Sequence, residues 1–182
     1  MYDVTTLKRR KILTSNDYTS KEFVSVNFAP SNEKSMLVTL TSEPYQVILW
    51  TWDKAKCFTF QLVAGVTGNM SITQCSFHNQ DQNIVLITGN SVYKYYRVQD
   101  NNILKPIHTQ ILKKDSHISN NYTCHTWLPD GRLLVCTDKG EIMLLESSGD
   151  YKMSLNEAPG DDFYIECILT YQKGFIIAGD NG

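Results

Sequence analysis

The fold is decided by the stretch Val47-Ile48-Leu49-Trp50-Thr51-Trp52-Asp53, an apolar run that ends in aromatic residues and then a charged turn. Similar endings recur along the chain at Tyr2-Asp3, Tyr96-Arg97 and Leu145-Glu146. The last aromatic or apolar residues of consecutive endings lie 50, 44 and 49 residues apart. A period of this size accommodates four short strands with their turns, and so small a sheet must stack against neighbours to bury its faces. The sequence therefore predicts an all-β fold, a partial β-propeller of about three and a half four-stranded blades.

The predicted blades follow the turn signals of the chain. Residues 1–14 form the end of a preceding blade, residues 21–63, 70–113 and 120–157 form one blade each, and residues 163–182 begin a truncated blade. Alternation of apolar and polar residues predicts strands at 8–13, 23–28, 35–41, 47–52, 57–62, 73–77, 83–88, 91–96, 106–112, 122–127, 132–137, 141–145 and 164–170, with a further strand from 174. The clearest turn is Pro129-Asp130-Gly131, because proline presets φ and glycine tolerates a positive φ.

The two ends of the chain resemble interrupted blades. Residues 1–3 read as the tail of a third strand, and the last unit stops where its third strand should begin. These ends predict that the chain is cut from a longer polypeptide. An isolated arc of this kind would expose a strand edge or an apolar sheet face at each end, so we expect it to aggregate when separated from its surroundings.

Composition excludes several classes of protein. The chain has 182 residues, 42% hydrophobic content and a net charge of −2, which favours neither nucleic acid nor an anionic membrane as a partner. The five cysteines form no C-x-x-C pair, so reduced thiols are expected rather than a zinc site or a redox dithiol. No stretch is long and apolar enough to predict a membrane-spanning segment.

No motif of catalysis or cofactor binding stands out. The sequence Gly65-Val66-Thr67-Gly68 lacks the lysine and the following helix of a phosphate-binding loop. Asp161-Asp162 is interpreted as a solvated loop, and Asp138 and Asp180 as turn residues. The histidines are scattered without ligand spacing and are expected to be structural or solvated: His78, His108, His117 and His125. We therefore expect no catalytic site, no cofactor and no metal.

One charge cluster is a candidate binding site, the basic run Lys8-Arg9-Arg10-Lys11. On the outer rim of a blade it could bind an acidic surface such as the tails of tubulin, through an attraction that salt would screen. The alternative is a charged outer edge that discourages edge-to-edge strand pairing. Both interpretations remain open from the sequence.

The turns and strand endings resemble those of WD-repeat proteins. Phe28-Ala29-Pro30-Ser31-Asn32 and Leu128-Pro129-Asp130-Gly131 stand where this family has its F-S-P-D-G turn, and Trp52-Asp53 is similar to its signature dipeptide. The family's Gly-His pair is absent, and the dipeptide is replaced by Tyr96-Arg97 and Leu145-Glu146. The blades are therefore divergent, and the resemblance does not predict the family's regular His/Ser/Asp/Trp network.

A narrower resemblance covers nearly the whole chain and rests on four segments. They are Asp17–Val26, Trp50–Lys56 and the pair Asn121–Trp127 and Thr137–Glu146, which are similar to cilia- and flagella-associated WD-repeat proteins of the axoneme, in particular the member associated with inner dynein arms. The resemblance implies a non-catalytic scaffold of the cilium that helps to dock or regulate inner dynein arms on doublet microtubules. It implies axonemal proteins as partners, with tubulin as a further candidate. The alternatives are a generic cytosolic adaptor or a propeller that binds a small ligand in its central channel.

Overall fold

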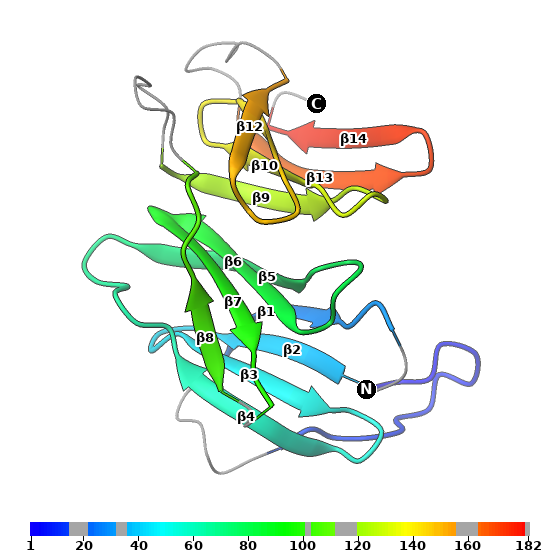
Figure 1. Ribbon diagram of the computed structural model, residues 1–182. Coiled ribbons are helices and arrows are strands. Elements are labelled where there is room, and N and C mark those ends of the chain that lie inside the picture. Colours follow the sequence, from blue (N-terminus) through cyan, green and yellow to red (C-terminus); the bar gives the residue numbers. More distant parts are fainter. Residues whose placement is uncertain (15–21, 32–35, 101–102, 112–119, 156–163, 181–182) are drawn as a thin grey trace.

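The chain folds into small antiparallel sheets that stack one on another (Figure 1). The computed structural model describes residues 1–14, 22–31, 36–100, 103–111, 120–155 and 164–180. The strands of the first sheet are β1 (Phe23–Phe28), β2 (Met36–Thr41), β3 (Gln46–Thr51) and β4 (Lys56–Leu62), and those of the second are β5 (Ser71–Phe77), β6 (Ile84–Asn90), β7 (Val92–Val98) and β8 (Leu104–Ile107). The third sheet contains β9 (Tyr122–Trp127), β10 (Leu133–Thr137), β11 (Ile142–Leu145) and β12 (Tyr151–Ser154), and the fourth contains β13 (Ile165–Tyr171) and β14 (Gly174–Gly179). The predicted all-β fold is confirmed.

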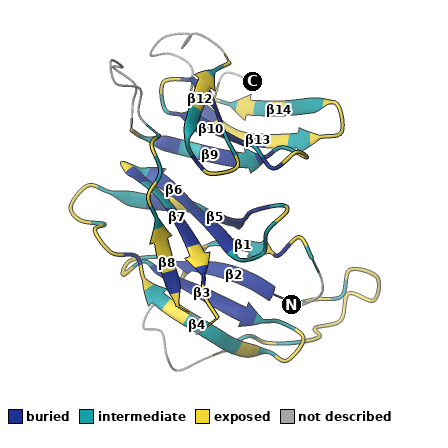
Figure 2. Ribbon diagram, in the orientation of Figure 1, coloured by how far each residue is buried: buried dark blue, intermediate teal, exposed yellow. Residues whose placement is uncertain are grey.

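Each complete sheet is an up-and-down meander in chain order, and its second and third strands are the most buried. In β2, β10 and β11 every residue is buried, whereas β4 and β12 alternate between intermediate and exposed positions (Figure 2). Strands covered on both faces read as continuous apolar runs, and strands at the rim need only one apolar face. The described residues contain no helix that could cross a membrane.

Stacking places an apolar core on each of the two faces of a central strand. In β10, Leu133 and Val135 pack against the second sheet, while Leu134 and Cys136 pack against β13 and β14. In β6, Val85 and Ile87 pack with the first sheet in the same manner. Because side chains of a strand alternate between faces, one short strand contributes to two separate cores. The cores between sheets are therefore what holds the successive blades together.

The first strand of every sheet carries a β-bulge at the corresponding place. The register of pairing shifts beside Val24, Thr73, Thr123 and Glu166. At the second sheet the bulge brings the Ser71 carbonyl so close to Gly89 that a Cβ on Gly89 would lie 2.0 Å from that oxygen. A residue with a side chain therefore cannot replace Gly89 without moving the backbone.

Two predicted strands differ from the structure, and one observed strand was not predicted. The strand predicted at 106–112 is β8, which spans Leu104–Ile107 because its pairing with β7 begins at Leu104 opposite Val98. The strand β12 was not predicted, since its four residues have too little alternation to stand out. The strand predicted at 8–13 is wrong in extent, because within the described residues its backbone pairs with residues 1–3 alone, around a bridge between Tyr2 and Arg9.

The faces at the two ends of the stack are only partly covered. At the first sheet, Leu37, Ile48 and Trp50 are buried, and Leu13 and Trp52 pack against them. The apolar residues Val24, Val26 and Phe28 of β1 are exposed, with Val26 63% accessible to solvent. At the other end Leu169 of β13 is 62% accessible. The stack therefore presents apolar side chains at both ends.

Candidate interaction surfaces and the contacts that position them

Polar side chains of the innermost strands connect neighbouring sheets. The Ser25 hydroxyl accepts a hydrogen bond from the Cys75 amide (3.1 Å) and donates one to the Cys75 carbonyl (3.3 Å). The Gln74 side chain makes the equivalent pair of bonds to the amide and carbonyl of His125, at 2.9 and 3.1 Å. The 50-residue and 51-residue separations of these partners are the sequence period expressed as contacts. These bonds fix the angular position of each blade relative to the next.

A buried polar cluster joins the second and third sheets. His125 of β9 contacts the Ser76 hydroxyl through Nε2 (2.7 Å) and the Thr88 hydroxyl through Nδ1 (2.8 Å). The Trp127 indole N–H also donates to Ser76, at 2.9 Å. Burial lowers the pKa of His125 to about 3, so its ring is neutral at physiological pH. This His125 cluster is a structural contact, as expected for His125, although the resemblance to WD-repeat proteins did not predict a network here.

His78 and His108, the other histidines that the structure describes, lie apart from the hydrogen bonds of the His125 cluster. His78 lies in the turn after β5, where its Nδ1 accepts the amide hydrogens of Gln80 and Asp81 and its ring packs on Trp127 at 4.4 Å between centroids. Burial lowers the pKa of His78. His108 follows β8 and is exposed, and His117 lies outside the described residues.

Asp138 and Asp180 accept hydrogen bonds from residues near their turns. The Asn121 side chain donates to the Asp138 carboxylate at 2.9 Å, and the Asp180 carboxylate accepts the Tyr164 amide hydrogen at 3.3 Å. Asp161 and Asp162 lie outside the described residues. Across the part of the chain that the structure describes, no group of three or more His, Cys, Asp or Glu is arranged to hold a metal ion.

The basic run lies on an exposed N-terminal arm, residues 1–14, beside the first sheet (Figure 1). Arg10 is paired with Asp3, whose carboxylate it contacts through Nη2 at 2.8 Å and Nε at 3.1 Å. The amide of Thr6, followed by the Arg10 guanidinium, lowers the pKa of Asp3. Within the described residues, no ion pair with a carboxylate is found for Lys8, Arg9 or Lys11. Of the four cations, Arg10 is therefore neutralised locally, while Lys8 and Arg9 are exposed and Lys11 is partly exposed.

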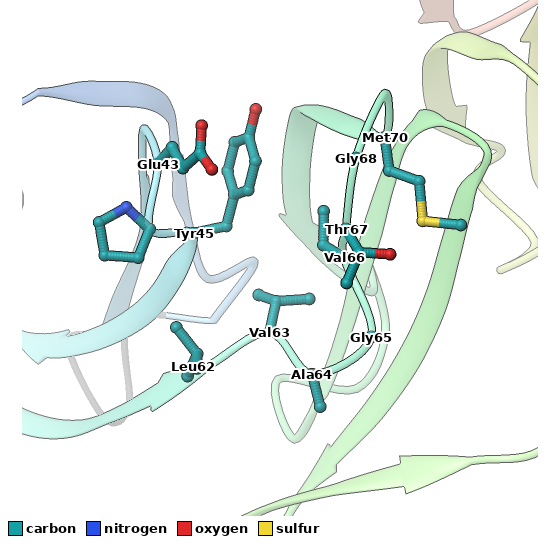
Figure 3. Close-up of a pocket in the computed structure, with 11 residues that line it drawn as sticks. Glu43, Tyr45, Leu62, Val63, Ala64, Gly65, Val66, Thr67, Gly68 and Met70 are labelled. Carbon is teal, nitrogen blue, oxygen red and sulfur yellow. The ribbon is translucent and has the colours of Figure 1, made fainter.

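A pocket of about 210 Å³ opens at the edge where β4 connects to β5 (Figure 3). Glu43 and Tyr45, from the turn between β2 and β3, stand side by side on one wall, and Val66 and Met70 form the opposite wall. The buried Val63 lies between the walls, and its amide donates to the Tyr45 carbonyl at 2.9 Å. The connecting loop thus fastens the first sheet to the second while leaving a hollow at its rim.

The lining of the pocket suits a protein contact better than a reaction. Most of its lining side chains are apolar, polar and apolar atoms share its exposed surface equally, and Glu43 carries the one charge. Such a hollow can hold an apolar side chain of a partner, with the carboxylate placed to meet a neighbouring cation. Sequence reasoning did not identify the pocket, because the two segments that build it lie about 20 residues apart and meet only through the pairing of β3 with β4.

The chain has relatives among known proteins. No protein-family model matches the chain. It is 31% identical over 175 residues, 93% of its length, to cilia- and flagella-associated protein 57 A of Tetrahymena thermophila, and 34% identical over 146 residues to cilia- and flagella-associated protein 57 of Mus musculus. The chain is a WD-repeat β-propeller segment related to cilia- and flagella-associated protein 57. The matched regions span 14% and 11% of those two relatives.

A solved structure supports the fold independently. The β-propeller domain of Cps50 (Swd1) from Myceliophteria thermophila superposes with a TM-score of 0.75 over 98% of this chain and 54% of that domain's chain. The two sequences are 14% identical, so the likeness concerns the fold alone. The stacked sheets therefore match part of a propeller ring, as the repeat period predicted.

Proposed function

We propose that the chain is part of a non-catalytic scaffold of the ciliary axoneme that helps to dock or regulate inner dynein arms on doublet microtubules. The observation that carries this proposal is the relation to cilia- and flagella-associated protein 57, which extends over 93% of the chain in the ciliate relative. The assignment of inner dynein arms rests on the resemblance found in the sequence. Axonemal proteins are the proposed partners.

The architecture suits a rigid platform. Cores between the sheets, side-chain bonds between the innermost strands and the buried His125 cluster leave the blades little freedom to move relative to one another. A scaffold that sets the position of a motor must transmit force without deforming. The described residues also offer no arrangement of acids, bases and nucleophiles that would favour chemistry over binding.

The arm cations are the first proposed contact. Lys8 and Arg9 are exposed on the arm and Lys11 is partly exposed, and their charge would attract an acidic surface such as the tails of tubulin. Such an attraction between exposed groups weakens as salt rises. The competing role, protection of a strand edge, predicts no contribution to binding.

Charge reversal separates these two roles. Changing Lys8, Arg9, Arg10 and Lys11 to Glu in the natural polypeptide should release it from demembranated axonemes at lower salt than the unchanged protein. The matched control reverses the same number of charges at exposed lysines elsewhere, namely Lys54, Lys56, Lys105 and Lys173. Equal retention of both variants would show that the basic run does not bind.

The pocket is the second proposed contact. Thr67→Arg places a long side chain at the rim, opposite Glu43, and should weaken partner retention if an apolar side chain enters the pocket. Asn69→Arg adds the same charge to an exposed position that does not line the pocket. Loss of binding in both variants would indicate a general charge effect instead.

The whole proposal is tested by locating the protein in the cell and by examining the inner dynein arms after its removal. The tagged natural polypeptide should remain with axonemes after detergent extraction, and its removal should reduce the inner dynein arms seen on doublets. A protein found in the soluble cell fraction, with all arms intact after its removal, would favour a generic adaptor and overturn the axonemal assignment.

A further inference from the structure

Two cysteines face each other across neighbouring strands of the third sheet. Cys124 of β9 is paired in register with Cys136 of β10. The Leu128 amide donates to the Arg132 carbonyl at 2.7 Å, which makes Leu128 and Arg132 a hydrogen-bonded pair. Since such pairs alternate along an antiparallel ladder, Cys124 and Cys136 are also a hydrogen-bonded pair, with Cα atoms about 5.5 Å apart. That separation lies within the range of Cα distances found across disulfides, about 4.4 to 6.8 Å.

The two thiols are buried side by side. Both point toward β13 and β14, and Cys124 is 6% and Cys136 0% accessible to solvent. The Cys124 sulfur accepts a hydrogen bond from the Thr123 hydroxyl at 3.7 Å. A hydrogen bond from the Cys136 thiol lowers the pKa of Cys124, and the same contact together with burial raises the pKa of Cys136. Cys124 is the less buried of the two and is the sulfur that peroxide reaches first, and Cys136 lies opposite it in register to resolve the product.

We propose that Cys124 and Cys136 form a peroxide-sensitive thiol pair that closes to a disulfide between β9 and β10. The Cys124 sulfur attacks one oxygen of hydrogen peroxide and the O–O bond breaks. Water departs with the thiol proton, and a sulfenic acid remains on Cys124. The Cys136 sulfur then attacks the Cys124 sulfur. The S–S bond forms, the S–O bond breaks, and the hydroxyl leaves as a second water with the Cys136 proton. Two thiols are oxidised and one peroxide is reduced to two waters.

The other cysteines lack this arrangement. Cys75 is buried opposite Ile87, and burial raises its pKa to about 12. Cys167 is exposed on β13 and is paired in register with Ala178. Oxidation of Cys167 alone would leave a sulfenic acid without a cross-strand thiol to resolve it. Cys57 is paired in register with Trp50, so Cys124 and Cys136 are the one pair of cysteines in register among the described strands, although Cys167 is the more accessible thiol and helps to raise the pKa of Cys136.

Peptide mapping of the natural polypeptide tests this proposal directly. The protein is treated with increasing hydrogen peroxide, its free thiols are alkylated, and it is digested with trypsin without reduction. Cleavage after Lys114, Arg132, Lys139, Lys152 and Lys173 places Cys124, Cys136 and Cys167 in separate peptides, 115–132, 133–139 and 153–173. We expect the linked pair 115–132 with 133–139 to exceed any link to 153–173 at least tenfold.

Two variants distinguish the mechanism from chance oxidation. Cys167→Ser should leave the link intact. Cys136→Ser should abolish it and leave a Cys124 sulfenic acid that a dimedone probe captures. If Cys136→Ser does not fold, the unchanged protein and Cys167→Ser still decide the matter. The proposal is overturned if Cys124 and Cys136 remain alkylatable at peroxide doses that oxidise Cys167, or if the dominant link includes Cys167.

Discussion

Two junctions of the same stack are built with different chemistry. Between the first and second sheets, Cys75 and Leu40 lie together in an apolar core. Between the second and third sheets, His125 and Thr88 stand at the corresponding positions and bond to each other at 2.8 Å. Register establishes the correspondence, because Leu40 and Thr88 are each paired with the side chain that bonds the next blade, Ser25 and Gln74 respectively.

The difference shows which part of a junction is fixed and which is free. In both, a polar side chain of one inner strand bonds the amide and carbonyl of the next, at Cys75 and at His125. The space behind that bond can be filled by apolar groups or by a fully bonded polar set. The polar solution is the more vulnerable one, since loss of one member leaves its partners buried and unsatisfied.

Removing the imidazole should have the largest effect on stability. His125→Ala leaves the Ser76 and Thr88 hydroxyls without their partner and opens a cavity, so the free energy of unfolding should fall by about 4 kcal/mol. Cys75→Ala removes only a sulfur from the apolar junction and should cost about 1 to 2 kcal/mol. Urea unfolding followed by tryptophan fluorescence measures both, because Trp127 contacts the His125 cluster. Equal losses would contradict the contrast between the junctions.

Substitution of Gly89 should have the next largest effect on the free energy of unfolding. An alanine Cβ at Gly89 would overlap the Ser71 carbonyl, so Gly89→Ala should reduce the free energy of unfolding by about 3 kcal/mol through backbone displacement. In the first sheet Thr41 stands at the equivalent place and uses its hydroxyl to accept the Gln46 amide hydrogen at 2.8 Å. Gly174→Ala is the control, since its Cβ would lie 3.4 Å from the nearest atom, the Tyr171 hydroxyl. A neutral Gly89→Ala would refute the bulge geometry.

The polar junction should also make stability depend on pH. Burial holds the pKa of His125 at about 3, whereas an unfolded histidine has a pKa of about 6.5. The unfolded chain therefore binds the proton first, and the contribution of His125 is complete above pH 6.5 and lost as the pH falls toward 3. At pH 4.5 the loss should reach about 2 to 3 kcal/mol.

The pH effect is isolated by comparison with His125→Gln, which keeps a neutral polar side chain at the junction. The variant should lose less stability than the unchanged protein between pH 7.5 and pH 4.5 in urea titrations. Parallel curves for the two proteins would show that His125 is not the group that titrates.

The smallest effect is expected for the bond that both junctions share. Ser25→Ala removes the partner of the Cys75 amide and should reduce the free energy of unfolding by about 1 kcal/mol. Gln74→Ala removes the equivalent bond to His125 and should cost a similar amount in the same urea assay. A far larger loss for Gln74→Ala would mean that the two bonds are not equivalent.

Sequence patterns captured the strands better than the contacts between sheets. The strands Phe23–Phe28 and Tyr122–Trp127 have the predicted bounds, because alternation and Pro-containing turns are local signals. The short β12 gave no such signal. Strand 8–13 was wrong in extent because alternation cannot reveal how many residues a pairing partner offers, here residues 1–3.

The candidate sites depend on long-range packing and were only partly predictable. The basic run could be read from composition, but the pairing of Arg10 with Asp3 required the fold of the arm. The His125 cluster had a readable signal, since His125 follows Ser76 by 49 residues, one repeat period. The cluster was not predicted because the Trp-Asp dipeptide of regular WD repeats is replaced in the second and third blades by Tyr96-Arg97 and Leu145-Glu146.

The central claim is that these stacked blades serve as a rigid scaffold beside inner dynein arms, and a cryo-electron microscopy map of axonemes containing the natural polypeptide tests it most directly. The account predicts radial four-stranded blades, with His125 between the second and third, in contact with a doublet microtubule near an inner dynein arm. Strands joined in one continuous sheet, or a propeller located away from the inner dynein arms, would contradict it.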